Sequence, residues 1–146
     1  MDPKLAPAAD LGLYEVGYEP IDEIHREFHA MLSAIGEPGD EGEKLLALHE
    51  HVLRHCSIEE RWMSESSFPA GAMHRHEHAM LLDVISEVRR RFDAGDSDIV
   101  LRLAAELPRW FQEHANEMDA ALALHLRNRA RDPVAAAVPP GTTLHA

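Results

Sequence analysis

Apolar residues recur with the period of an α-helix in four stretches of the chain, and polar breaks separate these stretches. The first begins near Pro20 and ends at Ile35, before the helix-breaking segment at 36–39. The others run from about Glu41 to Ser66, from about Ala70 to Phe92, and from a cap at Asp96 or Ser97 to about Arg129. Because strand patterns are absent and the breaks are short, we predict an all-α fold, an antiparallel up-down-up-down four-helix bundle.

The bundle is expected to form one domain over residues 19–129, between an N-terminal arm and a C-terminal tail. Residues 1–18 form the arm, in which Leu11, Leu13 and Tyr14 are suited to pack against the bundle. Residues 130–146 are rich in proline and alanine and predict a flexible, disordered tail. Pro108 lies inside the fourth stretch, where it removes one backbone hydrogen bond and either kinks that helix or divides it in two.

The same apolar positions predict the core. The second stretch contributes Leu45, Leu48, Val52, Cys56 and Met63, and the third contributes Met73, Met80, Leu81, Val84, Ile85 and Val88. We interpret Trp110 as a core residue. Methionine is flexible enough to fill irregular gaps, so the methionines at positions 31, 63, 73, 80 and 118 are interpreted as core fillers.

Composition and charge exclude several classes of protein. The formal net charge of -12 argues against a nucleic-acid partner, which requires a basic face. We find no apolar run that predicts a membrane span, and the N-terminus does not resemble a signal peptide. The single cysteine, Cys56, cannot form an intramolecular disulfide, which fits a reducing compartment. The expected location is therefore cytoplasmic.

Eleven histidines are the unusual feature of the composition, and their spacing indicates a metal site. His55 and Glu59 are four residues apart on the second stretch, and so are His74 and His78 on the third. Side chains at this spacing lie on one face of a helix, one turn apart. Each pair can therefore reach the same metal ion or two adjacent ions.

The first and fourth stretches bring further ligands to the same level. His114 and Asp119 are five residues apart, which rotates them by about 140° on a regular helix. They suit a metal site if the pair serves two ions or if the helix deforms locally. With a rise of about 1.5 Å per residue, the distances of these residues from the connecting loops place ligands from all four helices at one level of the bundle. Five imidazoles and two carboxylates exceed the four ligands of a structural zinc ion and suit two bridged first-row metal ions. Such a set favours iron without excluding zinc or manganese.

Four short motifs follow one another in the order of the four helices. They are ID-x-x-H at 21–25, H-x-x-x-E-E-x-x-M at 55–63, FP followed by H-x-x-x-H at 68–78, and WF-x-x-H-x-x-x-x-D at 110–119. Together they resemble the hemerythrin family, in its single-domain bacterial form, from Gly17 to about Leu126. The resemblance implies two iron ions (Fe2+/Fe3+) with an oxo or hydroxo bridge, and reversible dioxygen binding for oxygen carriage, storage or sensing.

The resemblance also assigns roles to residues. It implies that one iron takes His74, His78 and His114, that the other takes His25 and His55 and keeps an open position, and that Glu59 and Asp119 bridge them. It places Phe28, Cys56 and Phe111 around the open position as walls of an oxygen pocket. It implies a binding protein without catalytic residues, with dioxygen and an unidentified oxygen-consuming or signalling protein as partners.

Two positions depart from the family pattern. Ile24 stands where glutamine is usual, and Cys56 stands where phenylalanine is usual. A smaller residue at the second position either widens the pocket and speeds autoxidation, leaves space that Phe28 and Phe111 refill, or is inert.

His29 and His51 each lie one helical turn from an expected ligand. They are interpreted either as a pair, sensitive to pH, that supports the ligand histidines, or as solvated histidines at the rim.

The remaining alternatives concern function, namely a di-iron oxidase or peroxidase and a nitric oxide-binding protein. Ferritin-like di-iron enzymes use two Glu-x-x-His motifs, and no glutamate here has a histidine three residues later. The ligand set therefore favours binding over catalysis.

Overall fold

The computed structural model describes residues 14–131, which form a bundle of helices. Its elements are α1 (Glu19–Ile35), α2 (Glu41–Glu65), α3 (Gly71–Asp93), α4 (Asp98–His114), a π-helical segment η3 (Ala115–Asp119) and α5 (Ala120–Arg131). Between residues 14 and 131 there is no strand. The predicted all-α four-helix bundle is confirmed. The predictions for Leu11, for Leu13 and for the tail beyond Arg131 lie outside the described residues.

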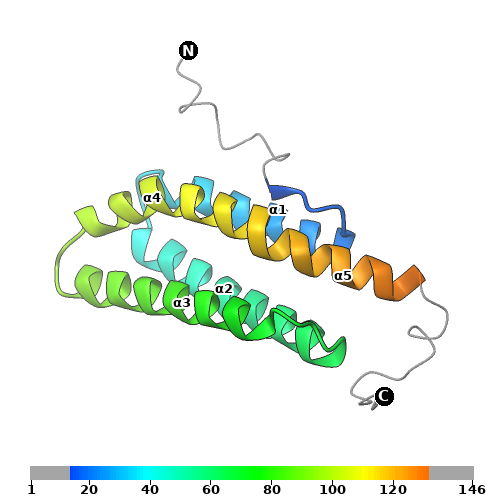
Figure 1. The fold of residues 1–146 in the computed structure, drawn as a ribbon. Helices are drawn as coiled ribbons and strands as arrows, with labels where there is room; N and C mark the ends of the chain where they lie inside the picture. Colours follow the sequence, from blue (N-terminus) through cyan, green and yellow to red (C-terminus); the bar gives the residue numbers. More distant parts are fainter. Residues whose placement is uncertain (1–13, 132–146) are drawn as a thin grey trace.

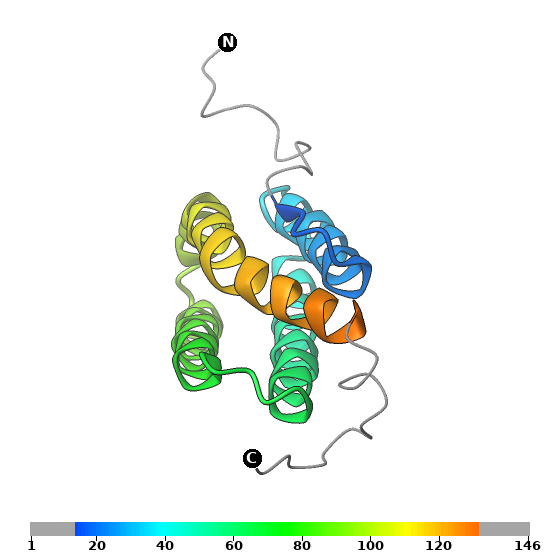
Figure 2. The same ribbon diagram turned by 45° about the vertical axis from the view of Figure 1, so that its right-hand side comes forward.

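The four long helices pack in two layers, with α1 and α4 in one and α2 and α3 in the other (Figure 1). Figure 2 shows them as the corners of a square, in which α5 continues from α4 and crosses the end of the bundle. The first connection ends in the left-handed conformation, with a φ of 95° at Gly39 and 53° at Asp40. Ser97 occupies the cap position of α4, although its side chain makes no capping hydrogen bond.

Two apolar clusters fill the bundle on either side of a polar level. The larger contains Phe28, Leu32, Ile35, Leu45, Leu48, Val52, Cys56, Leu81, Ile85, Val88, Val100, Leu103, Leu107 and Phe111 among others. The smaller lies toward the other end and contains Ile21, Met63, Leu122, Ala123 and Leu126. Along α2, Cys56 belongs to the larger cluster and Met63 to the smaller. The residues between them, which include Glu59, therefore lie at a level enclosed by apolar packing from both sides.

Part of the predicted core is wrong. Met73, Met80 and Val84 on α3 are 64%, 48% and 51% exposed. The apolar positions of α3 cover a wider arc than the helix buries, because only one side of α3 faces the bundle interior. Leu81, Ile85 and Val88 occupy that side and are buried, as predicted. Among the methionines, Met63 is buried and Met31 packs against the larger cluster. Trp110 also packs against that cluster but is only partly buried.

The fourth helix is continuous through Pro108, so the alternative in which this proline divides the helix is wrong. Its irregularity comes one turn after Phe111, where the backbone is π-helical from Ala115 to Asp119. Within residues 14–131, no helix combines the length and the apolar character needed to cross a membrane.

Candidate metal centre

The structure brings together all seven side chains that the sequence predicted as metal ligands. They are His25 from α1, His55 and Glu59 from α2, His74 and His78 from α3, His114 from the end of α4, and Asp119 from the end of η3. All seven are buried, with exposed fractions between 0% and 5%. Every long helix of the bundle therefore contributes at least one of these side chains to a single buried cluster.

The π-helical segment explains how His114 and Asp119 can act together. A π-turn inserts one extra residue relative to an α-helix and so changes which residues share a face. In this structure Nε2 of His114 lies 3.1 Å from Oδ1 of Asp119. The local deformation considered from the sequence is confirmed.

The two carboxylates each direct one oxygen to one group of histidines and the second oxygen to another. Oδ1 of Asp119 lies 2.9 Å from Nε2 of His74, whereas Oδ2 lies 2.9 Å from Nε2 of His25. Oε1 of Glu59 lies 3.1 Å from Nε2 of His74, whereas Oε2 contacts Nε2 of His55. Both carboxylates are thus positioned between two sets of imidazoles.

These contacts define a three-histidine set and a two-histidine set that share both carboxylates. In the first set, His74, His78 and His114 join Glu59 and Asp119, and in the second, His25 and His55 join the same two carboxylates. Within each set the potential ligand atoms lie within 4.8 Å of one another. This is the division that the family resemblance implied, reached here from interatomic distances.

The donor atoms fit a metal site better than a network of hydrogen bonds. Within residues 14–131, four of them are buried and have no hydrogen-bond partner: Oε1 of Glu59, Nε2 of His74, Nε2 of His78 and Oδ1 of Asp119. Burying a polar atom without a partner costs about 1–3 kcal/mol. The atoms nevertheless converge on one place from three elements. Metal ions bound among them would satisfy all four atoms. Imidazole nitrogens together with carboxylate oxygens form a ligand set suited to iron.

Three of the five histidines are held from the outside through Nδ1. His25 donates to the carbonyl oxygen of Tyr14 (2.6 Å), His78 donates to Glu60 (3.2 Å), and His114 donates to Glu77 (2.9 Å). A proton fixed on Nδ1 leaves the lone pair of Nε2 directed into the cluster, which is the usual arrangement around metal-binding histidines. Sequence reasoning missed all three acceptors. Glu60 and Glu77 each stand beside a predicted ligand, and that adjacency was the available indication.

Without metal ions, the buried carboxylates strongly affect the histidines around them. Burial lowers the pKa of His74, but the close carboxylates of Asp119 and Glu59 outweigh this and raise it to about 9. In the same way the pKa values of His25 and His114 are raised despite burial. Burial raises the pKa of Glu59 and Asp119, yet the neighbouring histidines lower both values overall. Positive charge, from protons or from metal ions, is therefore required at this level of the bundle.

The predicted pocket residues lie on different sides of the cluster. The ring of Phe111 lies 5.0 Å from that of His25 and therefore adjoins the two-histidine set, and the ring of Phe28 packs against Phe111 at 4.3 Å. The thiol of Cys56 instead groups with Glu60 and His78, on the side of the three-histidine set. Side chains of adjacent residues on a helix point about 100° apart. The side chain of Cys56 therefore points away from that of His55, which belongs to the two-histidine set. Burial raises the pKa of the thiol, which fits the inert interpretation.

His29 and His51 are buried, at 6% and 4% exposed, so the interpretation as solvated rim histidines is wrong. His51 stacks on Phe28 and pairs with the carboxylate of Glu27 at 3.1 Å. His29 packs against the ring of Tyr14 (5.4 Å), which confirms that this part of the arm packs on the bundle. No hydrogen bond joins the two histidines within the part of the chain that the structure describes.

Comparisons with known proteins agree with this geometry. A family model described as "Hemerythrin HHE cation binding domain" matches residues 16–124. A bacteriohemerythrin of Ralstonia nicotianae is 34% identical over 119 residues, covering 80% of this chain and 87% of the relative. A bacteriohemerythrin of Stenotrophomonas maltophilia is 31% identical over 133 residues, covering 80% and 82%, and one of Methylococcus capsulatus is 26% identical, covering 77% and 88%. No solved structure matches the chain significantly.

Proposed function

The chain belongs to the hemerythrin family, and on that basis we propose that it binds dioxygen reversibly at a carboxylate-bridged pair of iron ions. One observation carries the proposal, namely that Glu59 and Asp119 each face both histidine sets. Sharing both carboxylates between two sets suits two ions rather than one. Because the sets contain unequal numbers of histidines, one ion has fewer protein ligands and keeps room for a small molecule.

The residues divide the work of such a site. His74, His78 and His114 would hold one ion, His25 and His55 the other, and the two carboxylates would bridge them. When bound, a pair of ferrous ions supplies the electrons that dioxygen accepts on binding and returns on release. The outer hydrogen bonds from Nδ1 keep the Nε2 atoms in place as the charge at the centre changes.

The surroundings of the two-histidine set favour binding over further chemistry. Phe28 and Phe111 are 0% and 1% exposed; Phe111 lies beside His25 and Phe28 packs behind Phe111, so the two rings exclude water from that side. The rings packed around Phe111 are those of the proposed ligands His25, His55 and His114, of Phe28, and of Tyr14. Burial raises the pKa of the Tyr14 phenol further above its ordinary value, which keeps it neutral. We therefore propose a role in oxygen carriage, storage or sensing, with dioxygen as the ligand.

An optical titration tests the proposal. The full chain is loaded anaerobically with Fe2+ and titrated with dioxygen, and a charge-transfer band should appear and then disappear when dioxygen is removed. His25→Ala should abolish the band, whereas His76→Ala, at an exposed position of α3, should preserve it. Irreversible oxidation with continuing turnover of a reductant would instead identify an oxidase or peroxidase. A band produced by nitric oxide and not by dioxygen would identify a nitric oxide-binding protein.

A further inference from the structure

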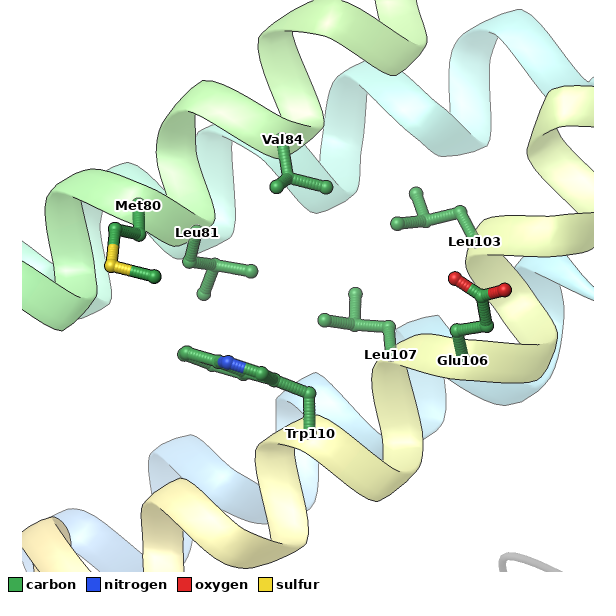
Figure 3. Close-up of a pocket in the computed structure, with 7 residues that line it drawn as sticks. All are labelled: Met80, Leu81, Val84, Leu103, Glu106, Leu107 and Trp110. Atoms are coloured by element: carbon green, nitrogen blue, oxygen red, sulfur yellow. The ribbon is translucent and has the colours of Figure 1, made fainter.

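A groove between α3 and α4 is not used by the proposed oxygen chemistry. Its volume is about 210 Å³, and its lining residues are Met80, Leu81, Val84, Leu103, Glu106, Leu107 and Trp110. Figure 3 shows the side chains of α3 and α4 that face each other across it. Met80 and Val84 are about half exposed, so the groove is open to solvent. They are two of the three positions of α3 that were predicted to be buried and are exposed.

Trp110 connects this groove to the candidate metal centre. Its indole ring lies across one end of the groove (Figure 3). The same ring is stacked on the imidazole of His114, with centroids 5.1 Å apart and an angle of 9° between the planes. The other groove residues on α4 precede Trp110 in the chain, whereas His114 follows it by one turn. A molecule in the groove would therefore be separated from a proposed ligand by a single aromatic ring.

We propose that this groove binds a small neutral aromatic reductant of the hydroquinone class, whose electrons reach the oxidised metal centre through Trp110 and His114. The inference rests on the proposed function, because it requires a centre that can be oxidised. A hydroquinone loses two electrons and its two hydroxyl protons and becomes a quinone. These two electrons would suffice to reduce two ferric ions held by the cluster to the ferrous state. Glu106 accepts one proton at the groove and solvent accepts the other.

The size and shape of the groove fit this class of ligand. An apolar cavity of about 150 Å³ is large enough to hold benzene, so about 210 Å³ accommodates one substituted ring or a small fused pair. Aromatic rings gain stabilisation when they pack in offset or edge-to-face contact. The indole of Trp110 provides that contact, and the aliphatic side chains of Leu81, Leu103 and Leu107 provide the remaining apolar surface.

The charge of the groove favours a neutral hydroxyl compound. Among residues 14–131, Glu106 is the single charged residue that lines the groove, and neither lysine nor arginine does. A carboxylate repels an anionic reductant, whereas it accepts a hydrogen bond from a phenolic hydroxyl group. The ligand class therefore follows from an apolar wall, one aromatic face and one acceptor.

The groove lies at a different place from the position where dioxygen is proposed to bind. His114 belongs to the three-histidine set, whereas the expected open position adjoins His25, His55 and Phe111. A reductant in the groove does not occupy the oxygen pocket. Reduction of an autoxidised centre and binding of dioxygen can thus use different histidine sets of the cluster.

Binding is tested with phenol in the zinc-loaded full chain, which has no redox chemistry. Trp62→Phe leaves Trp110 as the sole tryptophan, since the chain has two. Phenol should quench its fluorescence saturably, with a Kd on the order of 1 mM for so small a ligand. In this background Val84→Phe fills the groove and should weaken binding by about tenfold or more. Leu101→Phe is the matched control on α4, because Leu101 is 57% exposed and does not line the groove.

Electron transfer is tested by reducing the oxidised iron-loaded protein with menadiol under anaerobic conditions. The rate should saturate with menadiol concentration, and Val84→Phe should lower it about tenfold, in line with the weaker binding. The rate of reduction by dithionite, which needs no apolar site, should be unchanged in both Val84→Phe and Leu101→Phe.

Three results would overturn the inference. They are quenching by phenol that does not saturate, equal effects of the Val84 and Leu101 variants, and dimerisation through the groove, seen as a doubled mass that Val84→Phe abolishes. Failure of reversible oxygenation alongside Val84-dependent phenol binding would refute the proposed function and still support an aromatic site in the groove.

Discussion

Removing the metal ions should make the stability of the bundle depend strongly on pH between about 6.5 and 9. In the metal-free chain, Glu59 and Asp119 are 0% exposed, and protonated imidazoles balance their charges. Burial lowers the pKa of His74, but Asp119 and Glu59 raise it from 6.5 to about 9. A histidine with a raised pKa stabilises the fold fully below its unfolded value, here 6.5. This stabilisation is lost as the pH rises through about 9.

The size of the effect follows from the two pKa values of His74. Each unit of difference between the folded and unfolded pKa values corresponds to about 1.4 kcal/mol. Protonation of His74 therefore contributes about 3 kcal/mol to the free energy of unfolding. His74 is 1% exposed, so solvent screens this contribution little. Three kilocalories is a large part of the roughly 5–15 kcal/mol that stabilises a typical domain. For a chain of this size it corresponds to a fall in Tm of about 10 °C.

At acid pH the dependence has the opposite sign, and the stability of the metal-free bundle falls as the pH decreases. Glu59 and Asp119 have pKa values below their ordinary values of 4.5 and 3.8, because the surrounding histidines outweigh burial. Their stabilising contribution is fully present above the unfolded values and is lost as the pH falls through the lower, folded ones. The metal-free bundle should therefore be most stable between about pH 4.5 and 6.5.

Urea unfolding after treatment with a chelator, followed by circular dichroism from pH 4 to 9.5, measures this profile. The metal-loaded protein should show a much smaller loss toward pH 9, since metal ions replace the protons. His74→Gln should remove most of the alkaline decline, and His76→Gln, at an exposed position on the same helix, should keep it. If the metal-free protein were equally stable at pH 6.5 and pH 9, the electrostatic account of the cluster would be refuted.

Three further predictions concern single residues. Glu77→Gln should weaken metal binding about 10- to 100-fold, measured by competition with a chelator, because Glu77 holds Nδ1 of His114. Cys56 is buried with a raised pKa, so it should react with a thiol reagent only on unfolding, whereas a cysteine introduced by Ser57→Cys, at an exposed position, should react in the folded protein. Phe111→Ala should destabilise the fold by about 3–5 kcal/mol in urea, and it should shorten the lifetime of the oxygenated protein; an unchanged lifetime would show that Phe111 does not shield the pocket.

The sequence predicted the helices and the seven clustered residues because both depend on local periodicity. His55 with Glu59, and His74 with His78, share a face on any regular helix. Short connections then make sequential helices antiparallel neighbours, which aligns the levels of the ligands. The structure shows in addition that Glu59 and Asp119 each contact both histidine sets. The spacing of these residues in the sequence did not determine this.

The features that the sequence did not predict depend on contacts between distant parts of the chain. The carbonyl oxygen of Tyr14 reaches His25 only because residues 14–18 fold back along α1, and any residue can supply a backbone carbonyl. Likewise, Met80 and Val84 have ordinary core chemistry, and they are exposed because only one side of α3 faces the bundle interior. His29 and His51 are buried by Tyr14 and Phe28, which periodicity did not indicate.

The π-helical segment shows how the demands of the cluster override local preference. A π-helix is rare and occurs mostly as a single turn at functional sites. An α-helical path would rotate Asp119 by about 140° from His114, whereas the observed path sets the two side chains 3.1 Å apart. Asp119 is also the residue that faces His25 on the neighbouring helix α1. The irregular turn therefore serves to place one carboxylate between helices that are distant in sequence, and it does so while α4 stays regular through Trp110 and His114, where the groove meets the cluster.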